Sequence, residues 1–275
     1  MTHLLPVSAL ILYIAGAAAY AGWLKSDRQV LLLRGRWLLL FGLVAHGAFL
    51  VLALGLWDSQ RSLDVMAVRP IALGFVSFAI IAVFLGLERV LGLSGLGLLV
   101  IVVSAVVMVI ASVVFHFGGQ VQEIAADPKL VIFHLAACLL ATVLLSFTFV
   151  FSLGVIAKEF SLKRSRLPRM LQRLPSLDRL ERFSTMTLTV GFWLMLVGVI
   201  TGVLLALSTN VDAPFSDPRV WWSMLTLAVY AVLLLFRSTR GLRGAQAAWL
   251  AVLGFATVAL SLLGVTLWGD TFHVY

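Results

Sequence analysis

The sequence predicts an all-α protein, a polytopic membrane helix bundle of about eight transmembrane helices with both termini outside. Of its 275 residues, 62% are hydrophobic and 12% are charged, and the mean hydropathy is +1.09. A soluble protein has about 25% charged residues. The apolar residues also occur in blocks long enough to cross a hydrocarbon layer of about 30 Å as helices. The composition therefore excludes a soluble enzyme or binding domain.

Each apolar block is expected to form a helix, because a helix satisfies its own backbone hydrogen bonds inside the membrane. The fifth block is longer than a bilayer requires, so it should tilt or extend beyond the membrane. The start of the chain, Met1 to Leu4, carries no basic residue, which predicts that the first block is retained as a span. The eight spans make residues 1–275 a single integral membrane domain. They cover residues 4–24, 37–57, 69–87, 92–114, 129–157, 186–208, 219–236 and 245–268.

The distribution of Lys and Arg predicts the orientation. Sixteen of the 20 basic residues lie in four alternate connections, at 25–36, 88–91, 158–185 and 237–244. Cytoplasmic loops of membrane proteins carry an excess of Lys and Arg. These connections are therefore expected in the cytoplasm, and the chain in the bacterial cytoplasmic (inner) membrane. The net charge of +8 follows from topology, so membrane lipid is the predicted partner and no nucleic acid is required.

The connection 158–185 is the largest predicted extramembrane segment. Its second half, from Pro175 to Phe183, has a Ser cap and apolar residues at helical spacing. This pattern predicts a short amphipathic helix on the cytoplasmic interface. The basic residues of the connection either serve only to retain it in the cytoplasm or also contact anionic lipid.

Histidines are the main candidates for chemistry, since polar residues inside a membrane are costly. His46 falls in mid-membrane, where it either makes an interhelical hydrogen bond or serves as a ligand or proton relay. The others fall near the outer surface, where histidines are either solvated or able to bind a metal; they are His3, His116, His134 and His273. Two imidazoles from different helices form a suitable axial pair for haem iron. His134 follows a helix-start signal at Asp127-Pro128, and His273 lies on a short tail.

Other motifs narrow the possibilities. Cys138 is the only cysteine, so the chain has no CxxC redox pair and no covalent haem attachment site. Gly198 and Gly202 fit the small-xxx-small pattern of close helix contact. The sequence contains no phosphate-binding loop, HExxH motif or plausible hydrolytic triad.

From the fifth span onward, the chain resembles the cytochrome c assembly family of membrane proteins, the group that includes CcsA, CcmC, HemX and YpjD. The residues that carry the resemblance, in chain order, are His134-Leu135-Ala136-Ala137, Leu174-Pro175-Ser176-Leu177-Asp178-Arg179-Leu180, Gly191-Phe192, Gly198-Val199-Ile200-Thr201-Gly202, Arg237 with Gly241-Leu242-Arg243-Gly244, and Gly264-Val265 before His273-Val274-Tyr275. His46 is similar to the second-helix histidine of YpjD-like members.

The resemblance implies haem handling at the outer face, with haem b as the cofactor. His134 and His273 would ligate the haem iron, and Trp222 would form an apolar wall. The propionates would need cations, and Arg219, Arg69 or Lys129 are the few available on that side. His46 is a further candidate for cofactor binding.

The chain also departs from the family pattern. Pro214 and Ser216 stand where tryptophans are expected, and Leu235 replaces the family's inner histidine. The chain therefore looks closest to the HemX/YpjD branch, which favours an accessory protein over a complete haem ligase.

The sequence is compatible with three functions. The leading hypothesis is a haem-binding accessory protein in cytochrome c maturation or tetrapyrrole metabolism, which works with cytochrome-maturation partner proteins. A membrane scaffold that has lost the haem site is the second. The third is a small-molecule or metal transporter that uses His46.

Overall fold

Helices make up every regular element that the structure describes. The structure is a computed structural model, and it describes residues 4–58, 65–117, 128–163, 168–208 and 218–267. The all-α prediction is confirmed. The long helices are α1 (Leu4–Ser26), α2 (Gln29–Asp58), α3 (Val65–Leu91), α4 (Gly97–Phe117), α5 (Pro128–Lys163), α7 (Leu177–Ser208), α8 (Pro218–Arg240) and α9 (Gly244–Leu267), and the short ones are η1 (Ser94–Leu96) and α6 (Arg169–Gln172).

Length and composition make this a multi-pass membrane protein. Within the described residues, seven helices are long and apolar enough to cross a membrane. The eighth predicted span corresponds to α9, whose segment Gly244–Leu260 is also an apolar helix. Large apolar side chains such as Phe41, Val44 and Val90 point outward from the bundle. An exposed surface of this kind suits lipid and not water.

Two helices begin at least two turns earlier than predicted, and one predicted element is wrong. α2 begins at Gln29 rather than at residue 37, and α7 begins at Leu177 rather than at residue 186. No separate interfacial helix forms over 175–183, because residues from Leu177 onward are the first turns of α7. Leu180 is fully buried, and a Cβ added at Gly154 of α5 would lie 3.3 Å from its methyl groups. This residue packs into the bundle and not against lipid headgroups.

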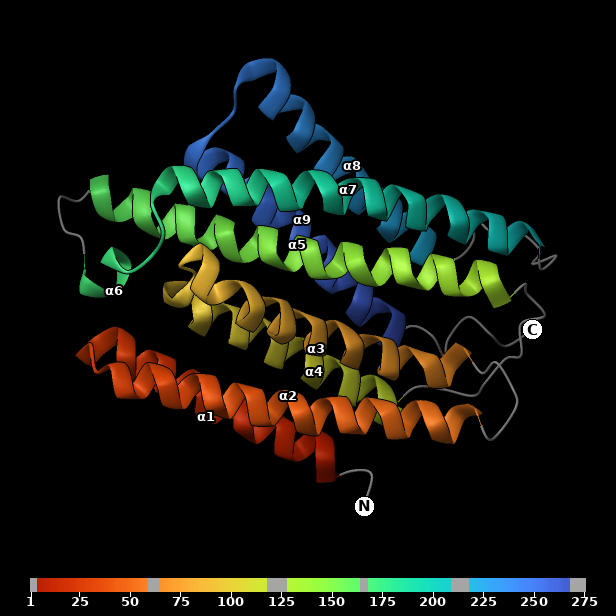
Figure 1. Cartoon of the computed structure of the whole chain (residues 1–275). Helices are drawn as coiled ribbons and strands as arrows, with labels where there is room; N and C mark the ends of the chain where they lie inside the picture. The colour runs from red at the N-terminus through yellow and green to blue at the C-terminus, as the bar shows by residue number, and fades with distance from the viewer. Residues whose placement is uncertain (1–3, 59–64, 118–127, 164–167, 209–217, 268–275) are drawn as a thin grey trace.

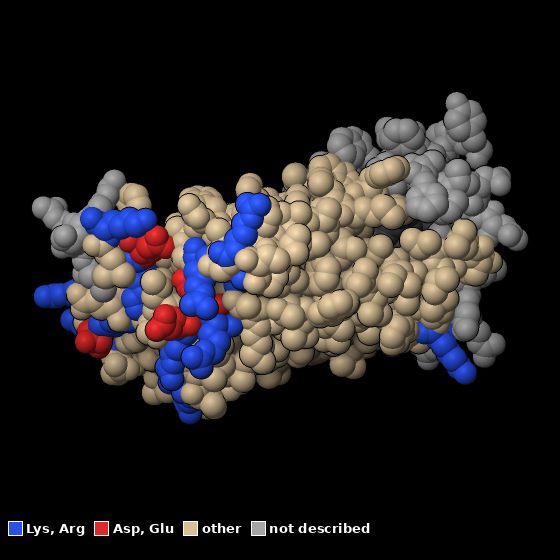
Figure 2. Space-filling view, turned by 90° about the horizontal axis from the view of Figure 1, so that it is seen from above, with Lys and Arg blue, Asp and Glu red and all other residues tan. Residues whose placement is uncertain are grey.

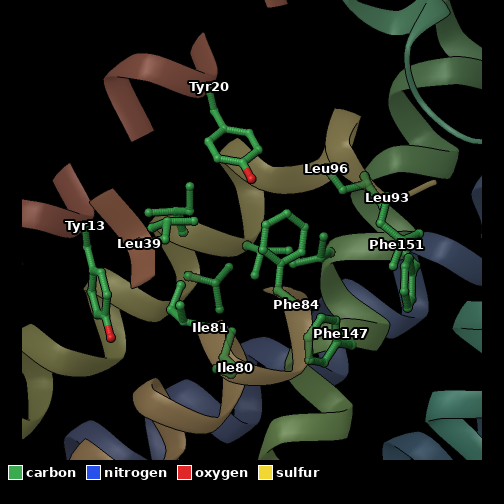
Figure 3. Close-up of a cluster of buried hydrophobic side chains, with 14 of the residues drawn as sticks. Tyr13, Tyr20, Leu39, Ile80, Ile81, Phe84, Leu93, Leu96, Phe147 and Phe151 are labelled. Carbon is green, nitrogen blue, oxygen red and sulfur yellow. The ribbon is translucent and has the colours of Figure 1, made fainter. Parts of the chain in front are cut away.

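Helices α1 to α5 and α7 lie roughly side by side along one direction, and α8 and α9 cross that direction obliquely (Figure 1). The main hydrophobic core joins α1, α2, α3, α4 and α5, and in it the rings of Tyr20 and Phe84 are 6.0 Å apart (Figure 3). A second, smaller core joins α5, α7, α8 and α9 around Leu145, Leu188 and Tyr230. α7 and α9 also add Leu180 and Ala248 to the main core, but α5 contributes five buried residues to it as well as Leu145 to the second core, so α5 connects the two.

α5 and α7 run antiparallel in a fixed register. Polar side-chain pairs join them in register, among them His134 with Thr201 at 3.2 Å, Thr148 with Thr187 at 2.8 Å, and Ser152 with Ser184 at 3.2 Å. Residue numbers rise along α5 as they fall along α7. Hydroxyl groups can bond across a helix pair in this way where water is absent.

Basic side chains gather at one end of the molecule (Figure 2). Arg173 ties the segment before α7 to the end of α1: its Nη1 donates to the carbonyl oxygen of Trp23 at 2.7 Å, and its Nη2 lies 2.6 Å from Asp27 Oδ1. The guanidinium also lies over the Trp23 ring, 4.7 Å from the centroid. By the positive-inside rule, this basic end is expected to face the cytoplasm.

The same end contains a buried ion pair between α2 and α3. Arg36 donates from Nε to Glu88 Oε2 at 3.0 Å and from Nη2 to Oε1 at 3.2 Å. The Glu88 side chain is only 1% exposed, and Arg36 also donates to Ser94 Oγ at 3.3 Å. Both residues fall in connections that the sequence predicts to face the cytoplasm. In the structure, the buried Glu88 and the partly buried Arg36 form a bidentate pair inside the bundle.

We expect Glu88→Ala to destabilise the protein by about 3–5 kcal/mol, because it leaves the Arg36 guanidinium without its buried partner. The measurement is unfolding of the purified protein in detergent. Lys163→Ala is the control, since it removes an ion pair with Glu159 in which Lys163 is 72% exposed. Such exposed pairs contribute about 0–1 kcal/mol. Equal losses in the two variants would contradict the structural importance of the Arg36–Glu88 pair.

Candidate functional site

His134 lies near the start of α5, at the end of the bundle opposite the basic connections. Pro128 is the first residue of this helix, a position where the missing N–H of proline costs little. The His134 ring reaches across to α7. Its Nδ1 lies 2.9 Å from the carbonyl oxygen of Gly198 and 3.2 Å from Thr201 Oγ1. The side chain is half-buried, held on one side by a neighbouring helix.

Two glycines of α7 make room for the side chains of α5. A Cβ at Gly202 would lie 2.9 Å from His134 Cε1, and a Cβ at Gly198 would lie 2.7 Å from Cys138 Sγ. Both distances are too short for real atoms. The predicted close contact at the small-xxx-small pattern is therefore confirmed, and it has a local purpose: the two glycines seat His134 and Cys138.

Cys138 lies one helical turn after His134 on the same face of α5. Its Sγ is 3.8 Å from His134 Nε2 and 3.9 Å from Nδ1. The thiol therefore packs against the edge of the imidazole, between that ring and the backbone of α7. Both side chains belong to one small polar cluster at the α5–α7 contact.

His46 occupies a different environment in the middle of α2. It is 1% exposed, and its Nδ1 lies 3.2 Å from the hydroxyl oxygen of Tyr13 on α1. The ring of Phe78 on α3 meets it edge-on at 5.9 Å. Of the alternatives for His46, an interhelical hydrogen bond is therefore present. Its contacts are with α1 and α3, whereas those of His134 are with α7, and the two histidines do not share a site.

The other candidate residues from the sequence are only partly covered by the described residues. Trp222 lies near the start of α8, half-buried, and its carbonyl oxygen accepts a hydrogen bond from Thr226 Oγ1 at 2.8 Å. Arg219 lies in the first turn of α8, but its side chain is outside the described residues, as are His3 and His273. His116 belongs to the last turn of α4, and its side chain is likewise not described.

Leu235 on α8 is 56% exposed and faces outward from the bundle. It stands where the family resemblance leads one to expect a histidine. An apolar side chain suits a position that faces lipid.

The sequence marks His134 as a candidate but does not indicate the groups that contact it. Thr201 and the carbonyl of Gly198 lie on α7, more than 60 residues along the chain. The available signal was the spacing of Gly198, Thr201 and Gly202, which places a hydroxyl and two gaps on one helix face. Nothing in the sequence shows which face of α5 meets that stripe.

Comparisons with known proteins identify relatives of this chain. A family model described as Cytochrome C assembly protein matches residues 4–273. Curated relatives of this chain include proteins named cytochrome c biogenesis protein CcsA. That of Synechococcus sp. (strain RCC307) is 37% identical over 98 residues, which is 36% of this chain and 32% of the relative. That of Thermosynechococcus vestitus is 38% identical over 106 residues, 38% of this chain and 33% of the relative. That of Parasynechococcus marenigrum is 34% identical over 103 residues, which is 38% of this chain and 34% of the relative.

The chain thus matches about a third of the length of these curated relatives. No solved structure matches it.

We expect Gly202→Ala to destabilise the protein by about 1–3 kcal/mol, because the added methyl group overlaps the His134 ring. Thermal unfolding of the purified protein measures the effect. Gly86→Ala on α3 is the matched control, since a Cβ there meets nothing within 4 Å. That variant should be neutral or slightly stabilising, because alanine favours a helix over glycine. If both substitutions are neutral, the tight seat for His134 does not exist.

Proposed function

The chain belongs to the cytochrome c assembly protein family, and from that premise we propose that it is a haem-binding accessory protein in cytochrome c maturation. Haem would sit at the end of the bundle that carries His134, the end opposite the basic connections. The observation that carries the proposal is the contact of His134 with α7. Its Nδ1 lies 2.9 Å from the Gly198 carbonyl oxygen, and its other ring nitrogen, Nε2, does not contact that carbonyl.

The residues present suit a haem. Imidazole nitrogen is a common axial ligand of haem iron, and His134 would supply one such ligand. We propose His273, on the tail after α9, as the second. Because Cys138 is the only cysteine, the haem would be held without covalent attachment, as haem b is. When bound, the haem supplies a redox-active iron.

Two residues near the start of α8 complete the proposed site. Trp222 would offer an apolar surface to the porphyrin, and Arg219 a cation to its propionates. Burial of a large apolar ring contributes most of the binding energy, while ligation sets the orientation. The Nδ1 of His46 is hydrogen-bonded to Tyr13 and the side chain is 1% exposed, so His46 would act in cofactor binding only if the helices around it moved apart.

We propose an accessory role and not a complete ligase. The lipid-facing Leu235 supports this, because a leucine cannot replace an inner haem ligand. The substitutions Pro214 and Ser216 in the outer segment point the same way, and they favour the HemX/YpjD branch of the family. The protein would act in the bacterial cytoplasmic membrane, in contact with lipid and with cytochrome-maturation partner proteins.

A scaffold without haem is the second candidate. The contact between His46 and Tyr13 favours it, because a buried histidine in this bundle already serves in helix packing. Under this reading, His134 would also be a packing residue. A transporter is disfavoured because His46 is 1% exposed and enclosed by Tyr13 and Phe78.

We expect His134→Ala to abolish most of the Soret absorbance of protein purified from haem-replete cells, because it removes an iron ligand. His273→Ala should have a similar effect. Phe133→Ala is the matched control, since the neighbouring side chain is 57% exposed and points away from the bundle. Its spectrum should remain that of the wild type.

A clean wild-type preparation with no Soret band would refute haem binding. Cytochrome c maturation that is unchanged by His134→Ala, in cells that lack the wild-type protein, would favour the scaffold.

A further inference from the structure

The neighbours of His134 Nδ1 determine which nitrogen of the ring carries the proton. The carbonyl oxygen of Gly198, 2.9 Å away, has no hydrogen and can only accept. A ring nitrogen at this distance must therefore donate, since two lone pairs facing each other would repel. In the neutral imidazole, the proton is then on Nδ1 and the lone pair is on Nε2.

Thr201 supports the same assignment. Its hydroxyl has one hydrogen, which is directed at the carbonyl oxygen of Val197 at 2.8 Å or of Gly198 at 3.0 Å. With that hydrogen in use on the backbone, the oxygen lone pairs are available to His134 Nδ1 at 3.2 Å. The two nearest polar neighbours of Nδ1 are therefore acceptors, and the Cys138 thiol lies farther away, at 3.9 Å.

We propose that Thr201 is a positioning residue that, with the Gly198 carbonyl, fixes the tautomer and orientation of His134 so that Nε2 is the iron ligand. This inference rests on the proposed function. A histidine that ligates a metal usually donates its other N–H to a carbonyl or another acceptor, and this bond orients the ring and strengthens it as a ligand. Here the acceptors come from α7, so the packing of α5 on α7 sets the ligand.

Gly202 also helps to determine where the His134 ring lies. Gly202 leaves the space that the ring occupies, because a Cβ there would fall 2.9 Å from Cε1 and 3.4 Å from Nδ1. The ring can therefore approach the backbone of α7 closely enough for Nδ1 to reach the Gly198 carbonyl. Gly202 thus lets the ring come close to α7, and the Gly198 carbonyl and the Thr201 hydroxyl set the orientation of the ring.

A purely structural threonine is the alternative, because threonines in membrane helices commonly bond to the carbonyl one turn earlier. Thr142 on α5 provides the matched case. Its hydroxyl donates to the carbonyl oxygen of Cys138 at 2.8 Å, as that of Thr201 donates to Val197. Both side chains are polar and lie within a span, but only Thr201 contacts the His134 ring. Comparing the two separates a general role in the helix from a specific role at the ring.

The first experiment uses the haem-free full-length chain. Histidine-selective nitrogen NMR in detergent, with His134→Ala used to assign the signal, reports which ring nitrogen is protonated. We expect protonation at Nδ1 and a lone pair at Nε2 in the wild type. Protonation at Nε2 alone would overturn the inference, whatever the protein binds. This measurement stands even if the wild type takes up no haem, an outcome that would refute the proposed function separately.

The second experiment is a haemin titration of variants followed by absorbance. Thr201→Val keeps the shape but removes the hydroxyl, and we expect a loss of affinity of about 10- to 100-fold, the usual effect of removing a partner behind a metal ligand. Thr201→Ser keeps the hydroxyl and should bind close to the wild type. Thr142→Val should also bind close to the wild type. Equal losses in Thr201→Val and Thr142→Val, or no loss in either, would overturn the role of Thr201.

Discussion

The close approach of α5 and α7 is the constraint on which the site depends. Two glycines, Gly198 and Gly202, remove the side chains that would hold the helices apart, and His134 and Cys138 fill the space. Small residues are the usual means of bringing membrane helices together, since lipid offers no hydrophobic driving force between them. Because α5 also contributes to both hydrophobic cores, the position of His134 is linked to the packing of the whole bundle.

The two ends of the bundle use polar groups differently. At the basic end, charged pairs join helices: Arg36 with Glu88, and Arg173 with Asp27. At the end with His134, the described contacts are between neutral groups, an imidazole, a hydroxyl and a carbonyl. A neutral imidazole with one nitrogen occupied is suited to bind a metal, whereas a side chain in an ion pair is not. The groups that hold His134 are thus uncharged, although most of the charge of the chain lies at the other end of the bundle.

Hydropathy and charge were sufficient to predict the fold class, the approximate spans and the shared end of the basic connections, because these follow from the membrane as a solvent. They could not predict pairings across the chain. The early start of α7 goes with the packing of Leu180 at Gly154 on α5. The burial of Glu88 goes with its pairing to Arg36, which is 52 residues away in sequence. The position of His134 in the sequence marks it as a candidate. Its partners on α7 depend on the register of the two helices, which the sequence does not show.

The central claim is that the α5–α7 contact presents His134 to a haem iron. The most direct test is a cryo-electron microscopy structure of the full chain purified with haem. We predict iron bonded to Nε2 of His134, with Nδ1 still hydrogen-bonded to the Gly198 carbonyl. Iron bound to Nδ1 of His134, or to His46 with His134 left as it is, would contradict the account.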